Sequence, residues 1–350
     1  RPTLAPDYRP SGRTAAGDVA VHLFEWRWAD IASECENVLG PAGYAAVQVS
    51  PPQEHALVTL FPWWQRYQPV SYALTRSRSG TEAEFTGMVA RCRAAGVAIY
   101  VDVVLNHMTA GAGTGSAGTT YTKYEYPGLW TAADFHAPCG VSNYQDAANV
   151  QDCELLGLAD LNTGLASVRQ KLADYLVALA RLGVAGFRID AAKHMQPVQL
   201  DQILALANQR LAAEGRALPY VFAEVIDYGG EAVRVGDYFG LGFSSGGSAD
   251  ITEFKVRGIA DKFRRVGNQR VGDLAQFSQA AWGLMPSDKA VVFLENHDTA
   301  RDNTSLTYRE PVRYRLAMTW LFFHETATPE IYTGYAFNRG STAGNDMGPP

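Results

Sequence analysis

Short apolar runs alternate with amphipathic segments along most of this chain. The runs have the length and composition of buried strands, and the segments between them repeat apolar residues every three or four positions, as helices do. We expect strands at 19–24, 45–49, 97–105, 184–189, 220–225, 250–254, 290–294 and 331–337, of which 250–254 has the weakest pattern. We expect helices at 28–39, 82–95, 165–182, 199–213, 256–266, 274–280 and 312–323.

Strands that alternate with helices predict a parallel sheet with right-handed crossovers. About eight strands fit a closed (β/α)8 TIM barrel. A doubly wound sheet fits less well, because no glycine-rich nucleotide loop follows the first strand.

The alternation is interrupted between 107 and 163, where glycine, serine, threonine and tyrosine are frequent and no helical pattern is clear. A structureless loop of this length is improbable in a compact domain, so we expect a small subdomain inserted after the third strand. The predicted organisation is a first part of the barrel at 1–106, the inserted subdomain at 107–163, and a second part of the barrel at 164–350.

Composition narrows the class of protein. The 350 residues are 47% hydrophobic and 19% charged, with a net charge of −6, which fits a large globular domain. No block of like charge indicates nucleic acid, and no apolar run approaches the roughly 20 residues of a membrane span. The opening residues lack the apolar core of a signal peptide, so we expect either a mature secreted form or a cytosolic protein.

Four cysteines and many aromatic residues leave alternatives open. The cysteines, which form no CxxC pair, suit either two disulfides in an oxidising compartment or four buried thiols. They are Cys35, Cys92, Cys139 and Cys153. Seven tryptophans and 17 tyrosines suit a sugar-binding cleft, but they are equally ordinary core residues.

Polar side chains follow several of the predicted strands. In a barrel they converge on the face at the carboxyl ends of the strands, where catalytic groups lie. Arg188 precedes Asp190 by two residues and points to the same side of the strand, so its charge favours an ionised carboxylate. Glu224 follows an apolar strand, which could raise its pKa, and Asp298 follows the seventh strand. Two carboxyls, one protonated and one ionised, are what hydrolysis of a glycosidic bond requires, although each acid alone could form a structural salt bridge.

Other residues near the strand ends have both a functional and a structural interpretation. Trp63 and Trp64 are adjacent, so on an extended segment at least one is exposed, either to a sugar ring or at a subdomain interface. Asn106, Asp160 and the carbonyl of His194 offer oxygen ligands for a hard cation, although their spacing alone is weak evidence.

Taken together, these residues resemble the α-amylase family of retaining glycoside hydrolases, specifically its animal and actinobacterial branch. The resemblance rests on motifs in the family's order and covers nearly the whole chain. The motifs are DVVLNH at 102–107, GFRIDAAKH at 186–194, EVID at 224–227, FLENHD at 293–298 and LADL at 158–161, with branch-specific matches at 22–26, 48–52, 63–72 and 283–288.

The resemblance implies a role for each matching position. Asp190 would be the nucleophile, Glu224 the general acid and base, and Asp298 a carboxylate that holds the sugar. Substrate would contact Trp63, Trp64, Tyr67, Gln68, His107, Arg188, Lys193, His194, Ile226 and His297. A structural calcium ion would bind Asn106, Asp160 and the carbonyls of Gln151 and His194, and disulfides would join Cys35 to Cys92 and Cys139 to Cys153.

Three features depart from the family's pattern. A chloride ion in this branch uses Arg188, Asn296 and a basic residue just before the last strand, but Glu330 stands at that position, which argues against chloride. Residues 324–327 replace a usual Pro-Tyr-Gly turn, with no effect that we can predict. The chain ends soon after the eighth strand, so we expect the last barrel helix and the C-terminal β-sandwich to be absent and stability to be lower than in a full-length relative.

The sequence therefore predicts a secreted, monomeric, calcium-dependent endo-acting enzyme that hydrolyses α-1,4-glucans with retention and binds neither nucleic acid nor membranes. One alternative is another α-glucan hydrolase or a transglycosylase of the same clan. A second is a non-catalytic carbohydrate-binding relative, against which the presence of all three acids argues.

Overall fold

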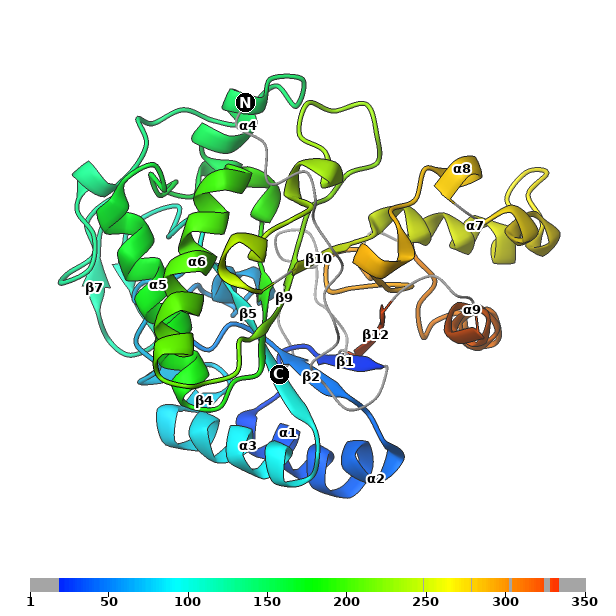
Figure 1. Cartoon of the computed structure of the whole chain (residues 1–350), viewed down its shortest axis with the longest axis horizontal. Helices are drawn as coiled ribbons and strands as arrows, with labels where there is room; N and C mark the ends of the chain where they lie inside the picture. The colour runs from blue at the N-terminus through cyan, green and yellow to red at the C-terminus, as the bar shows by residue number, and fades with distance from the viewer. Residues whose placement is uncertain (1–18, 248, 278, 302–303, 324–327, 334–350) are drawn as a thin grey trace.

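The computed structural model describes residues 19–247, 249–277, 279–301, 304–323 and 328–333. Eight parallel strands close into a barrel in the order β1-β12-β11-β10-β9-β8-β5-β2 (Figure 1). The predicted (β/α)8 barrel is thus confirmed. Its strands are β1 (Ala20–Leu23), β2 (Ala46–Val49), β5 (Ala98–Val103), β8 (Gly186–Ile189), β9 (Tyr220–Ala223), β10 (Ala249–Thr252), β11 (Ala290–Val292) and β12 (Thr328–Thr333).

Helices surround the barrel in the expected order, except that the helix expected at 274–280 is interrupted at Phe277, between the 3-10 segment Val271–Gln276 and α8 (Gln279–Trp282). The first, α1 (Trp28–Glu34), continues through a π-helical turn at Cys35–Leu39 into α2 (Gly40–Ala42). The others are α3 (Glu82–Ala94), α5 (Ala166–Arg181), α6 (Pro197–Ala213), α7 (Ile259–Arg264), α8 (Gln279–Trp282) and α9 (Pro311–Phe323). The long helix expected at 256–266 is shorter than its apolar pattern suggested, because its first turn is the 3-10 segment Phe254–Gly258.

Helix α3 shows how local sequence sets an element boundary. The amide of Thr81 donates to Glu84 Oε2 at 2.7 Å, and the amide of Glu84 donates to Thr81 Oγ1 at 3.4 Å. This reciprocal capping box satisfies amides that have no partner within the helix. Cys92 near its other end forms a disulfide with Cys35, which ties α3 to the segment after α1.

Strand β8 divides its side chains between two environments. Phe187 and Ile189 pack in the core between the barrel and its helices, so the alternation of a strand turns Gly186 and Arg188 into the barrel. A Cβ on Gly186 would lie 2.5 Å from the Tyr100 ring and 2.7 Å from the Tyr220 carbonyl oxygen. Only glycine fits at this position, and it allows the neighbouring strands to approach.

The segment between β5 and α5 is mostly irregular and lies to one side of the barrel (Figure 1). It contains the two-stranded ladder of β6 (Gly113–Thr114) and β7 (Thr120–Tyr121), and a second disulfide joins Cys139 to Cys153. The expectation of no helix here is wrong for α4 (Ala147–Asp152), which is too short to show a periodic pattern. We propose that residues 107–163 form the inserted subdomain.

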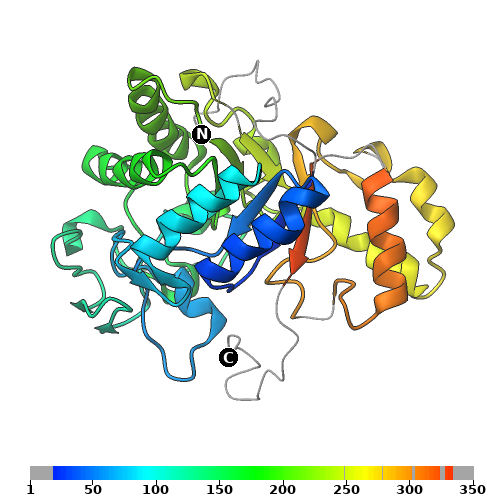
Figure 2. The same cartoon turned by 90° about the horizontal axis from the view of Figure 1, so that it is seen from below.

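The last strand begins earlier than the sequence indicated. It spans Thr328–Thr333 rather than 331–337, and residues 324–327 and 334–350 lie outside the described part of the chain. Helix α9 lies beside α7, apart from α1, α3, α5 and α6 (Figure 2). Its side chains Val312, Leu316 and Phe323 are 61%, 56% and 86% exposed, so one face of this helix is apolar.

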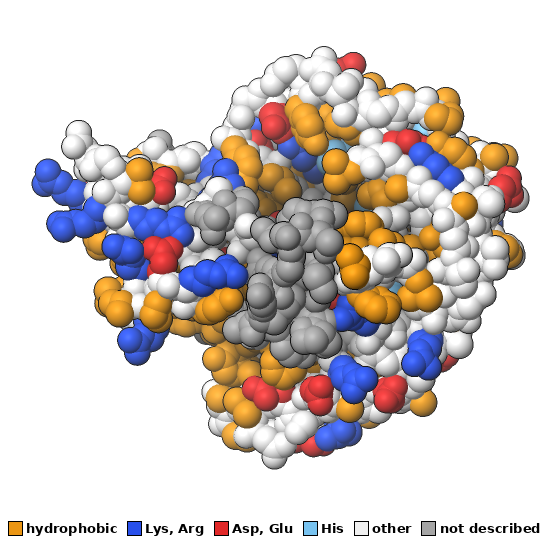
Figure 3. Space-filling model, turned by 180° about the vertical axis from the view of Figure 1, so that it is seen from behind, with side chains coloured by type: hydrophobic (Ala, Val, Ile, Leu, Met, Phe, Trp, Pro, Cys, Tyr) orange, Lys and Arg blue, Asp and Glu red, His pale blue; other side chains and the backbone are white. Residues whose placement is uncertain are grey.

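The part of the molecule that carries α7 and α9 also carries many basic side chains, which are visible from behind in Figure 3. Acidic partners accompany some of them, because Glu310 pairs with Arg264 and with Arg313. This surface is therefore mixed in sign rather than uniformly positive.

Candidate active site

A cavity of about 810 Å³ opens where the strands end and brings together most of the predicted site residues. The predicted residues that line it are Trp63, Trp64, Tyr67, Gln68, His107, Asp190, Lys193, His194, Glu224, Ile226, His297 and Asp298. Arg188, the remaining predicted residue, lies beneath the cavity and is buried. Ala110, Tyr144, Leu155, Leu156, Leu158, Ala191, Tyr228 and Glu231 complete the lining and were not predicted.

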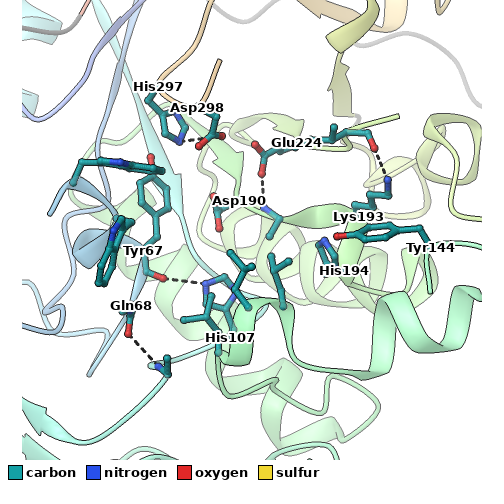
Figure 4. A pocket seen from close by; sticks show the side chains of 18 of the residues that line it. Tyr67, Gln68, His107, Tyr144, Asp190, Lys193, His194, Glu224, His297 and Asp298 are labelled. Atoms are coloured by element: carbon teal, nitrogen blue, oxygen red, sulfur yellow. Dashed lines mark hydrogen bonds and ion pairs between the residues drawn. The ribbon is translucent and has the colours of Figure 1, made fainter. Parts of the chain in front are cut away.

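A single guanidinium group holds three carboxylates at the base of the cavity. Arg188 Nη1 lies 2.8 Å from Asp190 Oδ1 and 2.7 Å from Asp102 Oδ1, and Nη2 lies 2.5 Å from Glu224 Oε1. Figure 4 shows Asp190 and Glu224 side by side, with Asp298 on the side of Glu224 that faces His297. The predicted pairing of Arg188 with Asp190 is present, but Arg188 also serves two further acids.

Burial dominates the electrostatics of this group. It raises the pKa of Glu224, and the charges of Asp190 and Asp298 raise it further, whereas Arg188 lowers it. Burial also raises the pKa of Asp190 despite the lowering effect of Arg188. The expectation that Arg188 alone keeps Asp190 ionised was therefore incomplete, because one cation is shared by three acids that are removed from water.

The backbone after Asp190 adopts an unusual conformation that orients Glu224. Ala191 has a φ of 48°, in the left-handed region that non-glycine residues rarely adopt. Its amide donates to Glu224 Oε2 at 2.8 Å. Strained backbone of this kind is often found at functional sites. Here it places the Ala191 amide where its hydrogen bond holds Oε2 of Glu224 in position.

Asp298 lies at the rim of the cavity, and its carboxyl is 38% exposed. Its Oδ2 is 3.6 Å from His297 Nε2. The His297 ring is stacked between Phe24 and Tyr67, with centroids 5.2 and 5.1 Å away. Burial lowers the pKa of His297 well below its usual value, so this side chain is a neutral hydrogen-bonding group.

Trp63 and Trp64 lie on the 3-10 helix Trp63–Tyr67, not on an extended segment. The helical turn allows both rings to line the cavity, which the argument from strand alternation had not anticipated. The Arg301 guanidinium lies 4.7 Å from the Trp63 ring centroid. The Tyr67 hydroxyl donates to Asp102 Oδ2 at 2.8 Å, so this tyrosine offers its ring to the cavity and its oxygen to the carboxylate cluster.

His107 and Gln68 are partly occupied by the protein itself. His107 Nε2 is 3.0 Å from the Tyr67 carbonyl oxygen, and its Nδ1 is 3.2 Å from Asn106 Nδ2. Gln68 Oε1 accepts from the Ala110 amide at 3.1 Å. These contacts fix the two side chains along one wall of the cavity.

The opposite wall contains Lys193, His194 and Ile226. Lys193 Nζ donates to the Ile226 carbonyl at 2.5 Å, forms an ion pair with Glu231, and lies 5.1 Å from the Tyr144 ring centroid. Tyr144 and Glu231 come from irregular loops far apart in the sequence, so no local pattern identified them.

The four residues predicted to hold a cation, Asn106, Gln151, Asp160 and His194, come from four segments and form two pairs. Asn106 and Asp160 are near each other, because the amide of Leu161 donates to the Asn106 carbonyl at 3.0 Å. His194 Nδ1 lies 2.9 Å from the carbonyl of Val150, the residue before Gln151. Asp160 Oδ1 is buried and has no hydrogen-bond partner among the described residues, while Oδ2 is 2.7 Å from His136 Nδ1.

Burial raises the pKa of Asp160 to about 7. An unsatisfied buried carboxylate oxygen beside a buried amide is the donor chemistry that suits a hard cation. The described residues contain no cluster of three or more His, Cys, Asp or Glu side chains that would hold a metal. A metal here would therefore need amide and carbonyl oxygens in addition to the Asp160 carboxylate.

The residues predicted for chloride are engaged in other contacts. Arg188 contacts three carboxylates, and Asn296 Oδ1 accepts from the amides of Asp298 and Thr299 at 3.0 and 2.9 Å. Glu330 lies within β12 rather than just before the last strand, because β12 begins at Thr328. Burial raises the pKa of Glu330 to about 8.

Comparison with known proteins matches residues 44–212 to the model of the alpha-amylase catalytic domain. An alpha-amylase of Thermomonospora curvata is 46% identical over 97% of this chain and 54% of its own length, and one of Tenebrio molitor is 44% identical over 94% of this chain and 69% of its own. This chain thus spans about half the length of the first relative.

A solved structure, alpha-amylase I from Eisenia fetida, superposes with a TM-score of 0.88 at 37% identity and covers 98% of this chain and 73% of that one. A mutant of the same enzyme, which matches equally well, was solved with maltohexaose.

Proposed function

This chain belongs to the α-amylase family, and from that premise we propose that it hydrolyses internal α-1,4-glucosidic bonds of starch, glycogen and maltooligosaccharides with retention of anomeric configuration. The observation that carries the proposal is the shared guanidinium of Arg188, which contacts Asp190 and Glu224 through different nitrogens. Carboxyls held by one guanidinium lie close together, which supports the retaining mechanism, in which the two carboxyls are about 5 Å apart.

In the proposed reaction Asp190 attacks the anomeric carbon while Glu224 gives its proton to the glycosidic oxygen. The bond to the leaving sugar breaks and a covalent glycosyl-enzyme forms. Glu224, now ionised, takes a proton from water as that water attacks the same carbon and releases Asp190. Asp298 accepts hydrogen bonds from sugar hydroxyls and helps to distort the ring at the cleaved bond.

The electrostatics support this division of roles. Burial raises the pKa of both carboxyls, and the charge of Asp190 raises the pKa of Glu224 further. Two coupled acids of this kind hold one proton between them over a range of pH. That state provides the ionised nucleophile and the protonated acid together.

The two walls of the cavity support binding of a chain of glucosyl units. We place Trp63, Trp64, Tyr67, Gln68 and His107 on the side of the sugars that become attached to Asp190. Lys193, His194 and Ile226 lie on the leaving-group side. The maltohexaose complex of the Eisenia fetida relative supports an oligosaccharide of this type as ligand.

We further propose a structural calcium ion held by Asn106, Asp160 and the carbonyls of Gln151 and His194. The buried, unpaired Asp160 Oδ1 supports it, because a cation would satisfy that oxygen. Bound calcium would join the segment after β5 to the turn after β8 that carries His194. We propose no chloride requirement, since three carboxylates already surround Arg188.

We propose that the enzyme is secreted and acts as a monomer. Two disulfides support an oxidising compartment. In the part of the chain that the structure describes, no helix combines the length and apolar character that crossing a bilayer requires.

The test is a reducing-sugar assay on soluble starch, with the anomer of the first products followed by proton NMR. We expect rapid release of α-anomeric oligosaccharides by the wild type and a loss of at least about 10³-fold in the Glu224→Gln variant, which keeps the shape of the side chain. Products of β configuration would refute retention, and substantial activity of Glu224→Gln would refute the role of Glu224.

A further inference from the structure

The turn after β11 carries Asp298 to the rim of the cavity and is closed by its own hydrogen bonds. The side chain of Asn296 accepts from the amides of Asp298 and Thr299. The carbonyl of Asn296 accepts from the amide of Ala300 at 3.0 Å. The amide of Arg301 donates to the Asp298 carbonyl at 3.2 Å. The position of the Asp298 carboxyl therefore depends on how this short turn is held.

The side chain of Arg301 returns to the beginning of the same turn. Its Nε donates to the His297 carbonyl at 2.9 Å, which fixes the peptide group that leads into Asp298. Arg301 is partly buried and is not among the described residues that line the cavity. It therefore influences the position of Asp298 without lining the space that a substrate would fill.

The guanidinium group of Arg301 also lies beside two aromatic rings. Its central carbon is 4.7 Å from the centroid of the Trp63 ring and 5.5 Å from that of the Phe24 ring. Cation–π contacts at these distances are attractive, and they strengthen where the groups are shielded from water. Because Trp63 lines the cavity, Arg301 connects one cavity wall to the turn that carries Asp298.

Arginine is the residue that can make both contacts at once. Its planar group stacks on a ring by its face and donates hydrogen bonds by its edge, whereas lysine has a single ammonium group on a flexible stem. Arg301 also acts on the buried carboxylate of Glu25, but that carboxylate lies 3.3 Å from Arg66 and 3.8 Å from Arg78 as well. Glu25 therefore keeps cationic partners when Arg301 is replaced, so we expect such variants to fold.

We propose that Arg301 is a positioning residue for the proposed hydrolysis. It holds the turn that carries Asp298 against the Trp63 ring, so that the carboxylate and the aromatic ring are fixed relative to each other where the glucan binds. The inference rests on the proposed function, which assigns Asp298 to the sugar at the cleaved bond. Arg301 lies outside the motif at 293–298, so the sequence pattern did not single it out.

The first test replaces Arg301 by methionine, which keeps an unbranched side chain beside the rings but loses the donor and the charge. We expect kcat for 4-nitrophenyl maltotrioside to fall about 30-fold, because a small displacement of a positioned group can cost a factor of this order. KM should rise only about threefold, since the aromatic wall remains. Arg313→Met is the matched control, because Arg313 lies on α9 with its side chain 52% exposed, and it should change neither value.

A lysine variant separates the geometry of the guanidinium group from its charge. Arg301→Lys keeps a charge near Glu25, so it should fold even if Arg301→Met does not. It loses the planar group that stacks and donates together, so we expect its kcat to stay about tenfold below that of the wild type. Recovery of the wild-type kcat by lysine would overturn the positioning role, because charge alone would then suffice.

A double-mutant cycle tests whether Arg301 acts through Asp298. In the Asp298→Asn background, Arg301→Met should lower kcat less than about threefold, because the effects of residues that act as one unit are not additive. A further loss of about 30-fold in that background would overturn the proposal, since a purely structural role lowers activity whether or not the carboxylate is present.

An unchanged kcat in Arg301→Met would overturn the positioning role while leaving the proposed function intact. A wild type that cleaves no α-glucan would refute the proposed function instead. Calorimetric titration with maltoheptaose would then decide the role of Arg301, and we expect about threefold weaker binding by Arg301→Met. Equal affinities of the two proteins would overturn the positioning role.

Discussion

Asp102 is a buried carboxylate that tunes the catalytic pair without lining the cavity. Its Oδ1 accepts a hydrogen bond from Arg188 Nη1 at 2.7 Å, and the same nitrogen donates to Asp190 Oδ1 at 2.8 Å. Its charge raises the pKa of Asp190. Replacing it in the Asp102→Asn variant removes one negative charge and leaves the size of the side chain unchanged.

The size of the effect follows from this geometry. Two carboxylate oxygens on one nitrogen are about 5 Å apart, and unit charges at that distance interact by about 3 kcal/mol at an effective dielectric constant of about 20. This repulsion corresponds to about two pKa units. Because the repulsion favours the protonated acid, its removal lowers the pKa of Asp190. It also lowers the pKa of Glu224, because Asp102 and Glu224 repel each other directly.

We therefore expect the bell-shaped pH profile of kcat/KM for Asp102→Asn to move towards acid by about one to two units. Burial raises the pKa of Asp102 itself, so in the wild type this residue carries its charge only at higher pH. Removing the charge should therefore move the alkaline limb of the profile more than the acid limb. The assay is hydrolysis of 4-nitrophenyl maltotrioside between pH 4 and 9, with the free energy of unfolding measured in urea.

Asp250→Asn is the matched control. Asp250 is also a buried aspartate that accepts a tyrosine hydroxyl, from Tyr220 at 2.6 Å, but it is not among the carboxylates that contact Arg188. We expect it to lower stability and leave the pH profile in place. An Asp102→Asn profile that is unmoved, or that moves towards alkali, would show that Asp102 has only a structural role.

Three further predictions concern stability. The disulfide between Cys139 and Cys153 closes a loop of 14 residues, so replacing both cysteines by serine should lower the free energy of unfolding by about 3 kcal/mol. The disulfide between Cys35 and Cys92 closes 57 residues, and the same replacement there should lower it by about 4 kcal/mol. Urea unfolding measures both changes. A calcium chelator should lower the melting temperature of the wild type but have little effect on that of Asp160→Asn, and an equal effect on both would contradict the proposed ligand set. Folding raises the pKa of Glu330 from 4.5 to about 8, so the native state retains a proton that the unfolded chain has released. The free energy of unfolding should therefore fall as pH rises across that interval, and Glu330→Gln should remove up to about 5 kcal/mol of this fall; parallel curves for the two proteins would contradict it.

The sequence predicted the barrel because the alternation of buried strands and amphipathic helices is a local property. Strand ends predicted the gathering of Asp190, Glu224 and Asp298, since a parallel barrel brings all carboxyl ends to one face. The order of motifs supplied the proposed roles of these residues, which spacing alone left open.

What the sequence did not predict depends on contacts between distant segments. Asp102 is the first residue of the motif at 102–107, but its contact with Arg188 across adjacent strands requires the register of β5 with β8. Its position between Val101 and Val103 was the available signal, since a charged residue in an apolar strand must face a polar partner. Tyr144 and Glu231 gave no such signal, because they meet at the cavity only through the folding of irregular loops.

The crowding of three acids around Arg188 sets a limit for engineering this protein. Charges that repel one another in a dry site raise the free energy of the folded state, so the group that would perform the reaction works against the fold that holds it. Screens that select for thermal tolerance alone would favour neutral replacements at Asp102, Asp190 or Glu224. Such variants would be more stable but would lose the proposed activity. Selection for robustness should therefore spare this cluster and act on surfaces such as the apolar face of α9.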